Sequence, residues 1–148
     1  MVPARISLVT LGVSDIARSR AFYRALGWET GVDMEEFAVF RTSGSLLALY
    51  PTAELTRDLG DEATEAGEMA GLPRRTSLAI NVESPEEVDR AVVDALAAGA
   101  AMLAAPAAAP WGGYTAIFAD PDGHAWEVAH NPGWPLGADN LPQLPQLP

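Results

Sequence analysis

A β-strand followed by a sharply bounded α-helix is predicted for residues 76–99, TSLAINVESPEEVDRAVVDALAAG. Ser84 can cap this helix, Pro85 suits its first position, and Glu87 can complete a capping box. Gly99 ends it, as glycine commonly does at a helix C-terminus. Between these signals the apolar residues recur at helical spacing, at Val88, Ala91, Val92, Ala95 and Leu96.

The same pattern occurs at the start of the chain. Residues 5–13, RISLVTLGV, alternate as a strand does, and Ser14 or Asp15 can cap the helix that follows. Gly27 ends that helix. Its apolar stripe consists of Ile16, Ser19, Phe22, Tyr23 and Leu26. Val13 therefore has the place that Val82 has in the second copy of the pattern.

Three further strands are predicted after each helix. They cover residues 28–33, 37–42 and 46–50 in the first half, and residues 100–104, 114–119 and 125–130 in the second. The DPDG sequence at 120–123 is a strong turn signal between the last two. The order βαβββ thus occurs twice, and we predict an internal duplication. The alternative is two unrelated α+β halves of similar layout.

These elements predict an α+β protein with a single domain over residues 1–132. Module one covers residues 1–60, a linker covers 61–73, and module two covers 74–132. A Pro-rich tail, 133–148, is expected to be extended or disordered. A short helix at 53–59 and a flexible AAPAAAP stretch at 104–110 complete the description.

Composition excludes several classes of function. Apolar residues make up 49% of the 148 residues, so the chain can bury a core. Nine basic and 20 acidic residues give a net charge of −11, which disfavours a nucleic-acid partner. No apolar run approaches the roughly 20 residues that cross a bilayer, so no membrane partner is expected. The chain has no cysteine and no signal-peptide pattern, so a cytoplasmic location is expected.

Four segments resemble marker stretches of a known superfamily. They are LGVSDIARSRAFYRALGW at 11–28, INVESPEEVDRAVVDALAAGA at 80–100, WGGY at 111–114 and FADPDGHAWEVAHNP at 118–132. In this order they resemble the vicinal oxygen chelate superfamily of glyoxalases, bleomycin-resistance proteins and dioxygenases. The resemblance implies a glyoxalase-like fold, in which two βαβββ modules form a curved mixed sheet, a cup over a ligand cleft. It also implies a homodimer. Many such proteins hold a divalent metal in the cup, and others sequester a drug without one.

The metal-ligand positions that this resemblance implies carry unsuitable side chains. They fall on Leu8, Ala48, Ser77 and Glu127. Leucine and alanine have no donor atom, a serine hydroxyl is a poor ligand, and a tight transition-metal site needs three or four protein donors. His124 and His130, the two histidines of the chain, alternate with Glu127 along their strand and so point to its other side. We therefore expect no metal cofactor.

Glu127 is the strong donor that remains among these positions. A carboxylate on a covered sheet face must be solvated, paired, protonated or coordinated. In a cleft it is a candidate general base, and Glu127 is our candidate catalytic residue. The alternative is a solvent-facing residue left over from a lost metal site. The residues alone leave both interpretations open.

Strand alternation predicts a ligand-binding surface of small and apolar residues around Glu127. Its expected members are Leu8, Thr10, Ala48, Ser77 and, at the edge, Tyr50. His130 lies at a strand end, where we expect it near the rim of the cleft. Trp111 and Tyr114 follow the flexible stretch and can close over a planar ligand. The alternative for Trp111 is a place in the core or in a dimer contact.

Three functions are consistent with these features. The leading hypothesis is metal-free binding of a small aromatic or amphipathic molecule, such as a drug or metabolite that the protein sequesters. The alternative is a lyase, isomerase or dioxygenase-type enzyme of the same superfamily that uses Glu127. A third is a regulatory or structural dimer.

Overall fold

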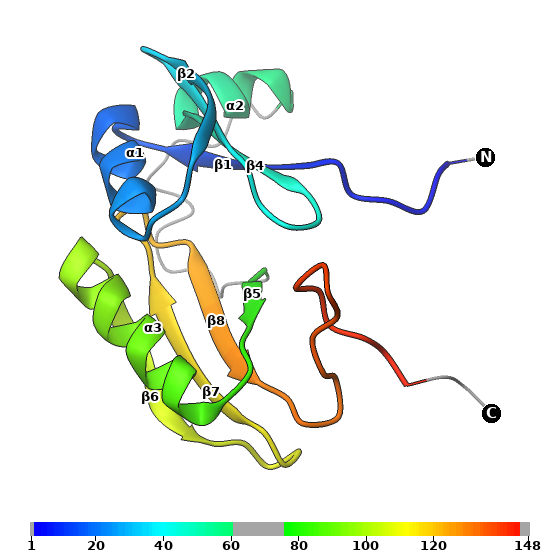
Figure 1. Ribbon diagram of the computed structural model, residues 1–148. Coiled ribbons are helices and arrows are strands. Elements are labelled where there is room, and N and C mark those ends of the chain that lie inside the picture. The colour runs from blue at the N-terminus through cyan, green and yellow to red at the C-terminus, as the bar shows by residue number, and fades with distance from the viewer. Residues whose placement is uncertain (1, 61–75, 146–148) are drawn as a thin grey trace. The chain divides into compact units, whose positions relative to one another are not determined.

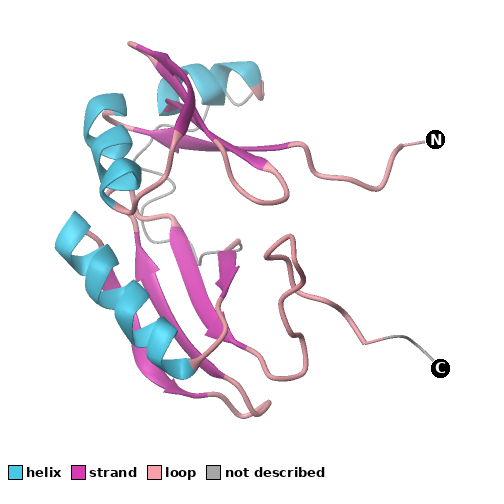
Figure 2. Ribbon diagram, viewed as in Figure 1, coloured by secondary structure: helices cyan, strands magenta, loops and turns pink. Residues whose placement is uncertain are grey.

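The computed structural model describes residues 2–60 and 76–145 of the chain. The chain divides into two compact units, Met1–Thr76 and Ser77–Pro148. Each unit has one four-stranded mixed sheet with a helix on one face (Figure 1, Figure 2). The predicted α+β class is therefore confirmed, and the predicted linker at 61–73 lies outside the described residues.

Unit 1 follows the predicted order of elements. They are β1 (Leu8–Val13), α1 (Ile16–Ala25), β2 (Thr30–Met34), β3 (Phe37–Phe40), β4 (Leu46–Pro51) and α2 (Thr52–Asp58). The sheet order is β1-β4-β3-β2, in which β1 and β4 are parallel and the other pairs are antiparallel.

Unit 2 repeats this arrangement. Its elements are β5 (Leu78–Asn81), α3 (Pro85–Ala98), β6 (Ala101–Ala108), β7 (Tyr114–Ala119) and β8 (Ala125–His130). The sheet order is β5-β8-β7-β6, again with one parallel pair, β5 with β8. Because element order and sheet order both recur, the predicted repeat of the βαβββ pattern is confirmed.

An aromatic cluster holds α1 against its sheet. Asp15 caps the helix, since its side chain accepts a hydrogen bond of 3.0 Å from the Arg18 N–H. The buried ring of Tyr23 then lies 5.6 Å from Phe40 and 5.4 Å from Trp28, centroid to centroid. Rings of this size contribute most of the apolar burial in a small core.

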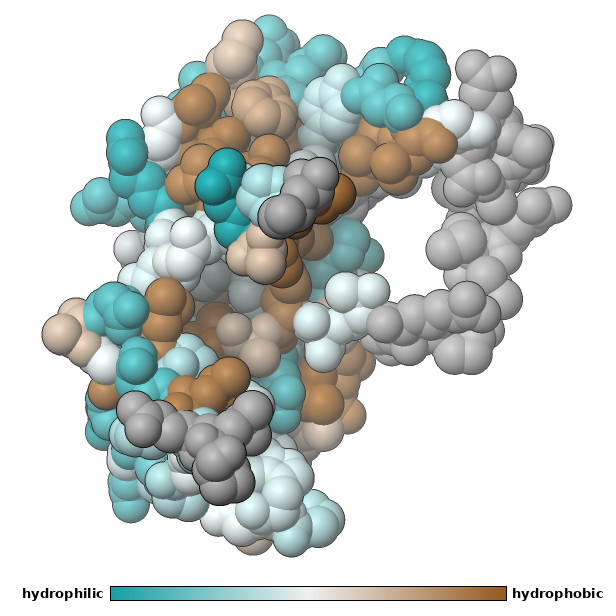
Figure 3. Space-filling view, turned by 90° about the vertical axis from the view of Figure 1, so that its right-hand side faces the viewer, coloured by the Kyte–Doolittle hydropathy of each residue, from teal (hydrophilic) through white to brown (hydrophobic). Residues whose placement is uncertain are grey.

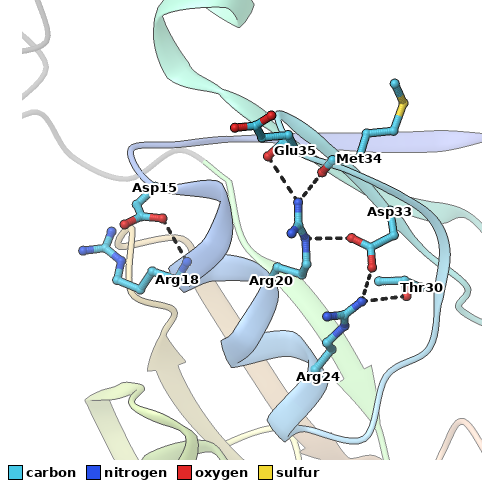
Figure 4. Close-up of polar contacts among 8 residues, drawn as sticks. All are labelled: Asp15, Arg18, Arg20, Arg24, Thr30, Asp33, Met34 and Glu35. Carbon is cyan, nitrogen blue, oxygen red and sulfur yellow. Dashed lines mark hydrogen bonds and ion pairs between the residues drawn. The ribbon is translucent and has the colours of Figure 1, made fainter.

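A charged cluster attaches the edge strand β2 to α1 (Figure 4). Arg20 Nε lies 3.0 Å from one Asp33 carboxylate oxygen, and Arg24 contacts the other. Arg20 also donates hydrogen bonds to the carbonyls of Met34 and Glu35. Two helix residues four positions apart therefore share one strand residue.

The predicted start and end of α3 are confirmed. The Ser84 hydroxyl accepts a hydrogen bond of 3.3 Å from the Glu87 N–H, and Gly99 has a left-handed φ of 109°. The Glu87 carboxylate accepts from the Glu83 N–H at 2.9 Å, one residue before the partner that a capping box predicts. Helix α3 packs Val88, Val92 and Ala95 against a sheet face on which Trp126 is buried.

The prediction for residues 100–110 is wrong in part. Strand β6 continues through Pro106 to Ala108, where a flexible stretch was expected. The strand pairs with β7 alone, and its register shifts twice between Met102 and Ala107. An edge strand with bulges tolerates proline, because no ladder hydrogen bond has to be made at that position.

The DPDG turn is confirmed and is tightly organised. Asp120 is buried, and its Oδ1 accepts hydrogen bonds of 3.0 Å from the Asp122 N–H and 2.9 Å from the His124 N–H. Gly123 supplies the positive φ of 88° that the turn needs. This turn sets the pairing of β7 with β8, on which the candidate site depends.

The tail is more ordered than expected over part of its length. Leu136 pairs with Pro142, and the Gly137 N–H donates to the Leu141 carbonyl at 2.9 Å, so residues 136–142 form a small hairpin. Residues 146–148 lie outside the described part of the chain. None of the described helices is long and apolar enough to span a membrane.

Candidate functional site

The sheet of unit 2 has one face toward α3 and one face away from it (Figure 2). Strand pairing places Glu127 between Ala79 of β5 and Ile117 of β7. Thr115 and Ala129 point to the same side by the alternation of strand residues. We call these five residues the Glu127 face. Glu127 is the charged member of the group, and its neighbours are small or apolar.

Glu127 is held by a neighbouring hydroxyl. The Thr115 Oγ1 donates a hydrogen bond of 2.8 Å to Glu127 Oε1, and both side chains are half-buried. Within residues 2–60 and 76–145, no other hydrogen bond and no ion pair involves Glu127. The second carboxylate oxygen therefore keeps its capacity to accept a hydrogen bond from a ligand.

The structure places Ser77 directly before β5, the strand that contains Ala79. Ser77 is exposed and alternates in phase with Ala79 along the chain. Ser77 therefore lies two residues before Ala79, and its side-chain direction toward Glu127 stays a prediction.

Tyr114 and His130 lie on the opposite face of the sheet, toward α3. They pair with each other across β7 and β8. The Tyr114 hydroxyl donates to Asp89 of α3 at 3.1 Å, and His130 Nδ1 lies 3.3 Å from the Val82 carbonyl oxygen. The expectation that Tyr114 closes over a ligand beside Glu127 is therefore not met, because Tyr114 is a residue of β7 and its side chain points away from Glu127.

Partial burial raises the pKa of the Tyr114 phenol, and its hydrogen bond to the Asp89 carboxylate raises it further. The phenol therefore keeps its proton at neutral pH and donates it to Asp89. This contact joins the start of β7 to α3, which is a structural role.

Trp111 lies in the turn between β6 and β7. Its side chain is 52% exposed, so the alternative that it fills the core is wrong. The indole rests on Gly113: a Cβ atom added to that glycine would lie only 1.8 Å from the ring. Gly113 thus lets the aromatic ring fold back on its own turn.

The sheet of unit 1 also has a face away from α1. Thr10 pairs with Ala48, and Ala48 pairs in turn with Val39. We call this the Ala48 face, and it further includes Leu8, Phe37, Leu46 and Tyr50 by strand alternation. Leu8 is 45% exposed. Figure 3 shows hydrophobic residues, in brown, at the surface of one side of the molecule. The sequence predicts four of these residues, Leu8, Thr10, Ala48 and Tyr50, for the ligand surface.

Two features limit the Ala48 face at the end of β1. Helix α2 packs there, since a Cβ atom on Gly12 would lie 3.2 Å from the Thr52 Oγ1 and 3.3 Å from Leu55 Cδ2. The Tyr50 ring meets Phe37 edge to face at 6.0 Å. Partial burial raises the pKa of the Tyr50 phenol, and Asp58 and Glu54 raise it further, so this phenol is neutral at physiological pH.

The residues present do not fit the divalent metal of the superfamily. Ala48 pairs with Thr10 in unit 1 as Glu127 pairs with Ala79 in unit 2, so the two positions are equivalent. One of them is a carboxylate and the other has no donor atom. In the part of the chain that the structure describes, no three His, Asp or Glu side chains are grouped so that they could hold a metal ion.

Two βαβββ units with the same sheet order define the glyoxalase-like class of fold. The chain belongs to the Glyoxalase/Bleomycin resistance protein/Dioxygenase superfamily, whose family model matches residues 5–128. No curated protein shows significant similarity to the chain.

Solved structures similar to this chain include three proteins described as glyoxalase-related, as a member of this superfamily or as a lactoylglutathione lyase. A glyoxalase-related enzyme from Fulvimarina pelagi is 34% identical, with a TM-score of 0.84 over 96% of this chain and 99% of its own. A glyoxalase/bleomycin resistance protein/dioxygenase family enzyme from Burkholderia phytofirmans PsJN is 23% identical, with a TM-score of 0.71 and coverage of 86% and 98%. A lactoylglutathione lyase from Agrobacterium tumefaciens is 22% identical, with a TM-score of 0.64 and coverage of 87% and 95%. The last two show similarity of fold alone.

Sequence reasoning missed Thr115 as the partner of Glu127. The signal was present in the DPDG turn, which pairs Ala119 with Ala125. Counting back along β7 and forward along β8 from that pair brings Thr115 diagonally across from Glu127. The missing step was the register between the strands.

Proposed function

We propose that this chain is a metal-independent member of its superfamily that binds a small aromatic or amphipathic molecule at the Glu127 face. The observation that carries the proposal is the composition of that face. A single carboxylate, held by Thr115, lies among Ala79, Ile117 and Ala129. Small-molecule sites typically combine an apolar surface with a few placed polar groups.

The donor set supports metal independence. Of the four superfamily ligand positions, Glu127 alone has a side chain that binds divalent metals well. The Ala48 face is a separate surface of unit 1, on which Leu8 and Leu46 are exposed while Ala48 itself is buried. A monomeric protein rarely exposes such residues together without a use for them.

Binding can be tested by blocking the face. Ala79 is exposed beside Glu127, so Ala79→Trp fills the surface without emptying the core. Val93→Trp is the matched control, because Val93 is exposed on α3, and α3 covers the sheet face opposite to Glu127. We expect small aromatic probes to bind the wild type and the control saturably in ligand-observed NMR, and to lose binding in Ala79→Trp. Equal binding by both variants would count against this face.

Metal independence has its own measurement. Elemental analysis of protein purified without chelator should find no stoichiometric divalent metal, and EDTA should leave probe binding unchanged. One equivalent of bound metal, or loss of probe binding in EDTA, contradicts the proposal.

The relative from Fulvimarina pelagi favours a second candidate function. It is described as a glyoxalase-related enzyme and is 34% identical over nearly the whole chain. In such a role Glu127 would act as a general base that removes a proton from a bound carbon acid. The test is exchange of that carbon-bound proton in D2O, followed by NMR. Glu127→Gln should abolish exchange while Ala79→Trp blocks both exchange and binding.

The superfamily resemblance also leads us to propose a homodimer. Sedimentation equilibrium should then give twice the monomer mass of 15.6 kDa. A monomer at the concentrations used for probe binding contradicts this assembly.

A further inference from the structure

We infer that the group recognised by Glu127 is cationic, so that the ligand of this face is an apolar or aromatic molecule carrying a protonated amine. This inference rests on the proposed binding function and adds the charge of the ligand to it. It follows from the hydrogen-bond capacity of Glu127, from its missing counter-ion and from the charge of the whole chain.

The hydrogen-bond capacity of the site is one-sided. A carboxylate only accepts hydrogen bonds, and the Thr115 hydroxyl uses its single proton on Glu127 Oε1. Ala79, Ile117 and Ala129 have no side-chain donor for Oε2. A ligand group that meets Oε2 must therefore be a donor, and a carboxylate or phosphate group there would be repelled.

Glu127 also lacks a counter-ion among the residues that the structure describes. Ion pairs observed there include those of Arg20 and Arg24 with Asp33, of Arg57 with Glu54 and of Arg90 with Glu87, and none involves Glu127. A half-buried carboxylate with apolar neighbours is incompletely solvated, and it gains more from a cation than from a neutral donor. A protonated amine supplies both the charge and the hydrogen bonds.

The charge of the whole chain acts in the same direction. A net charge of −11 gives the molecule a negative potential that attracts cations and repels anions. This attraction is screened by salt, whereas the burial of an apolar ring is not. The salt dependence of binding therefore separates the two contributions.

An organic cation suits this site better than a metal ion. One carboxylate and one hydroxyl that already donates its proton provide too few ligands for Mg²⁺, Ca²⁺ or Zn²⁺. An ammonium group needs only one such carboxylate, and the apolar part of the same molecule can lie on Ala79 and Ile117. The site thus matches an amphipathic cation.

Three probes with the same naphthalene ring and different polar groups test the inference: 1-naphthylmethylamine, 1-naphthalenemethanol and 1-naphthylacetic acid. Affinities are measured by isothermal titration calorimetry on the full chain and on Glu127→Gln. Glu29→Gln is the control, since it makes the same charge change at an exposed residue of unit 1. We expect the amine to bind wild type at least about tenfold more tightly than the alcohol, with the acid weakest. Glu127→Gln should remove that preference, and Glu29→Gln should keep it.

The outcomes separate this inference from the proposed function. Equal affinity for amine and alcohol, or an amine preference that survives Glu127→Gln, overturns the inference and leaves the binding function standing. If none of the three probes binds, the proposed function fails and the inference fails with it. Should Glu127→Gln prove unfolded by circular dichroism, the wild type decides: amine affinity must fall with added NaCl while alcohol affinity does not. An amine affinity that is independent of salt is evidence against a cation site.

Discussion

Thr115 and Glu127 lie diagonally across the β7–β8 hairpin, and the Thr115 hydroxyl donates a 2.8 Å hydrogen bond to Glu127 Oε1. The bond joins two residues of the face away from α3, where the other side chains are small or apolar. It fixes one carboxylate oxygen and leaves the other able to accept a further hydrogen bond.

Thr115→Val should lower the free energy of unfolding by about 1 kcal/mol. Valine keeps the shape of threonine but removes the donor, and an unpaired half-buried carboxylate loses a charge-assisted hydrogen bond. Thr10→Val is the control, because Thr10 is a half-buried strand threonine of unit 1 without a described hydrogen bond from its side chain. Urea titration followed by circular dichroism measures both variants. Equal midpoints for Thr115→Val and wild type would show that the hydrogen bond contributes nothing to stability.

Gly113→Ala should destabilise the protein by roughly 1–3 kcal/mol, in the range of other overpacking substitutions. The new Cβ would lie 1.8 Å from the Trp111 ring and 2.6 Å from the backbone carbonyl oxygen of His130, so both the ring and the backbone must move. Gly31→Ala is the control, since its Cβ would make ordinary contacts of 3.4 Å with the Arg41 side chain. Thermal melting gives the stability, and a shift of the tryptophan emission reports the displaced ring. An unchanged melting temperature contradicts the packing of Trp111 on Gly113.

Asp33→Asn should lower the free energy of unfolding by less than about 1 kcal/mol, although Asp33 contacts both Arg20 and Arg24. The Asp33 carboxylate is 41% exposed, and solvent and salt screen both ion pairs. The loss should therefore shrink further in 1 M NaCl, as measured by thermal melting at two salt concentrations. A large loss that is independent of salt would mean that the cluster acts through packing rather than charge.

Glu86→Gln should weaken the dependence of stability on acid pH. A hydrogen bond from its own backbone N–H and one with the Ser84 hydroxyl lower the pKa of Glu86. A lowered pKa in the folded state gives stability that is present above the ordinary glutamate pKa and is lost as the pH falls through the lowered value. The melting temperature of Glu86→Gln should therefore fall less than that of wild type between pH 7 and about pH 3. The melting temperature of the control Glu29→Gln should fall as much as that of the wild type. Parallel curves for Glu86→Gln and wild type contradict the assignment.

The local elements could be predicted because their signals lie within a few residues of one another. Ser84 and Gly99 mark the ends of α3, and the DPDG turn separates β7 from β8, as the structure confirms. Alternation along β8 also predicted that Trp126 and Glu127 point to opposite faces. Boundaries were less accurate where the environment decides, as in β6, whose edge position lets the strand continue through Pro106.

The candidate site could be predicted only as far as single strands allow. The superfamily resemblance implied Leu8, Ala48, Ser77 and Glu127 as the four ligand positions, and the pairing of Thr10 with Ala48 and of Ala79 with Glu127 shows that Ala48 and Glu127 are equivalent in the two units. We also expected Tyr114 to close over a ligand, whereas the structure has it bonded to Asp89 on the side of α3. A strand that begins at Tyr114 was predicted correctly, but the face to which the Tyr114 side chain points depends on the register of β7 with β8, which one segment of sequence does not contain.

By itself, the sequence determined the two βαβββ repeats, the helix ends, the faces of individual strands and the absence of good metal donors at three of four expected positions. These properties depend on residue type and on spacing along one segment. Only the tertiary structure decided that Thr115 binds Glu127, that Trp111 rests on Gly113 and that α2 packs at Gly12. These contacts join residues through strand register or through packing between elements, and a hydrogen bond or a close approach exists only once both partners are in place.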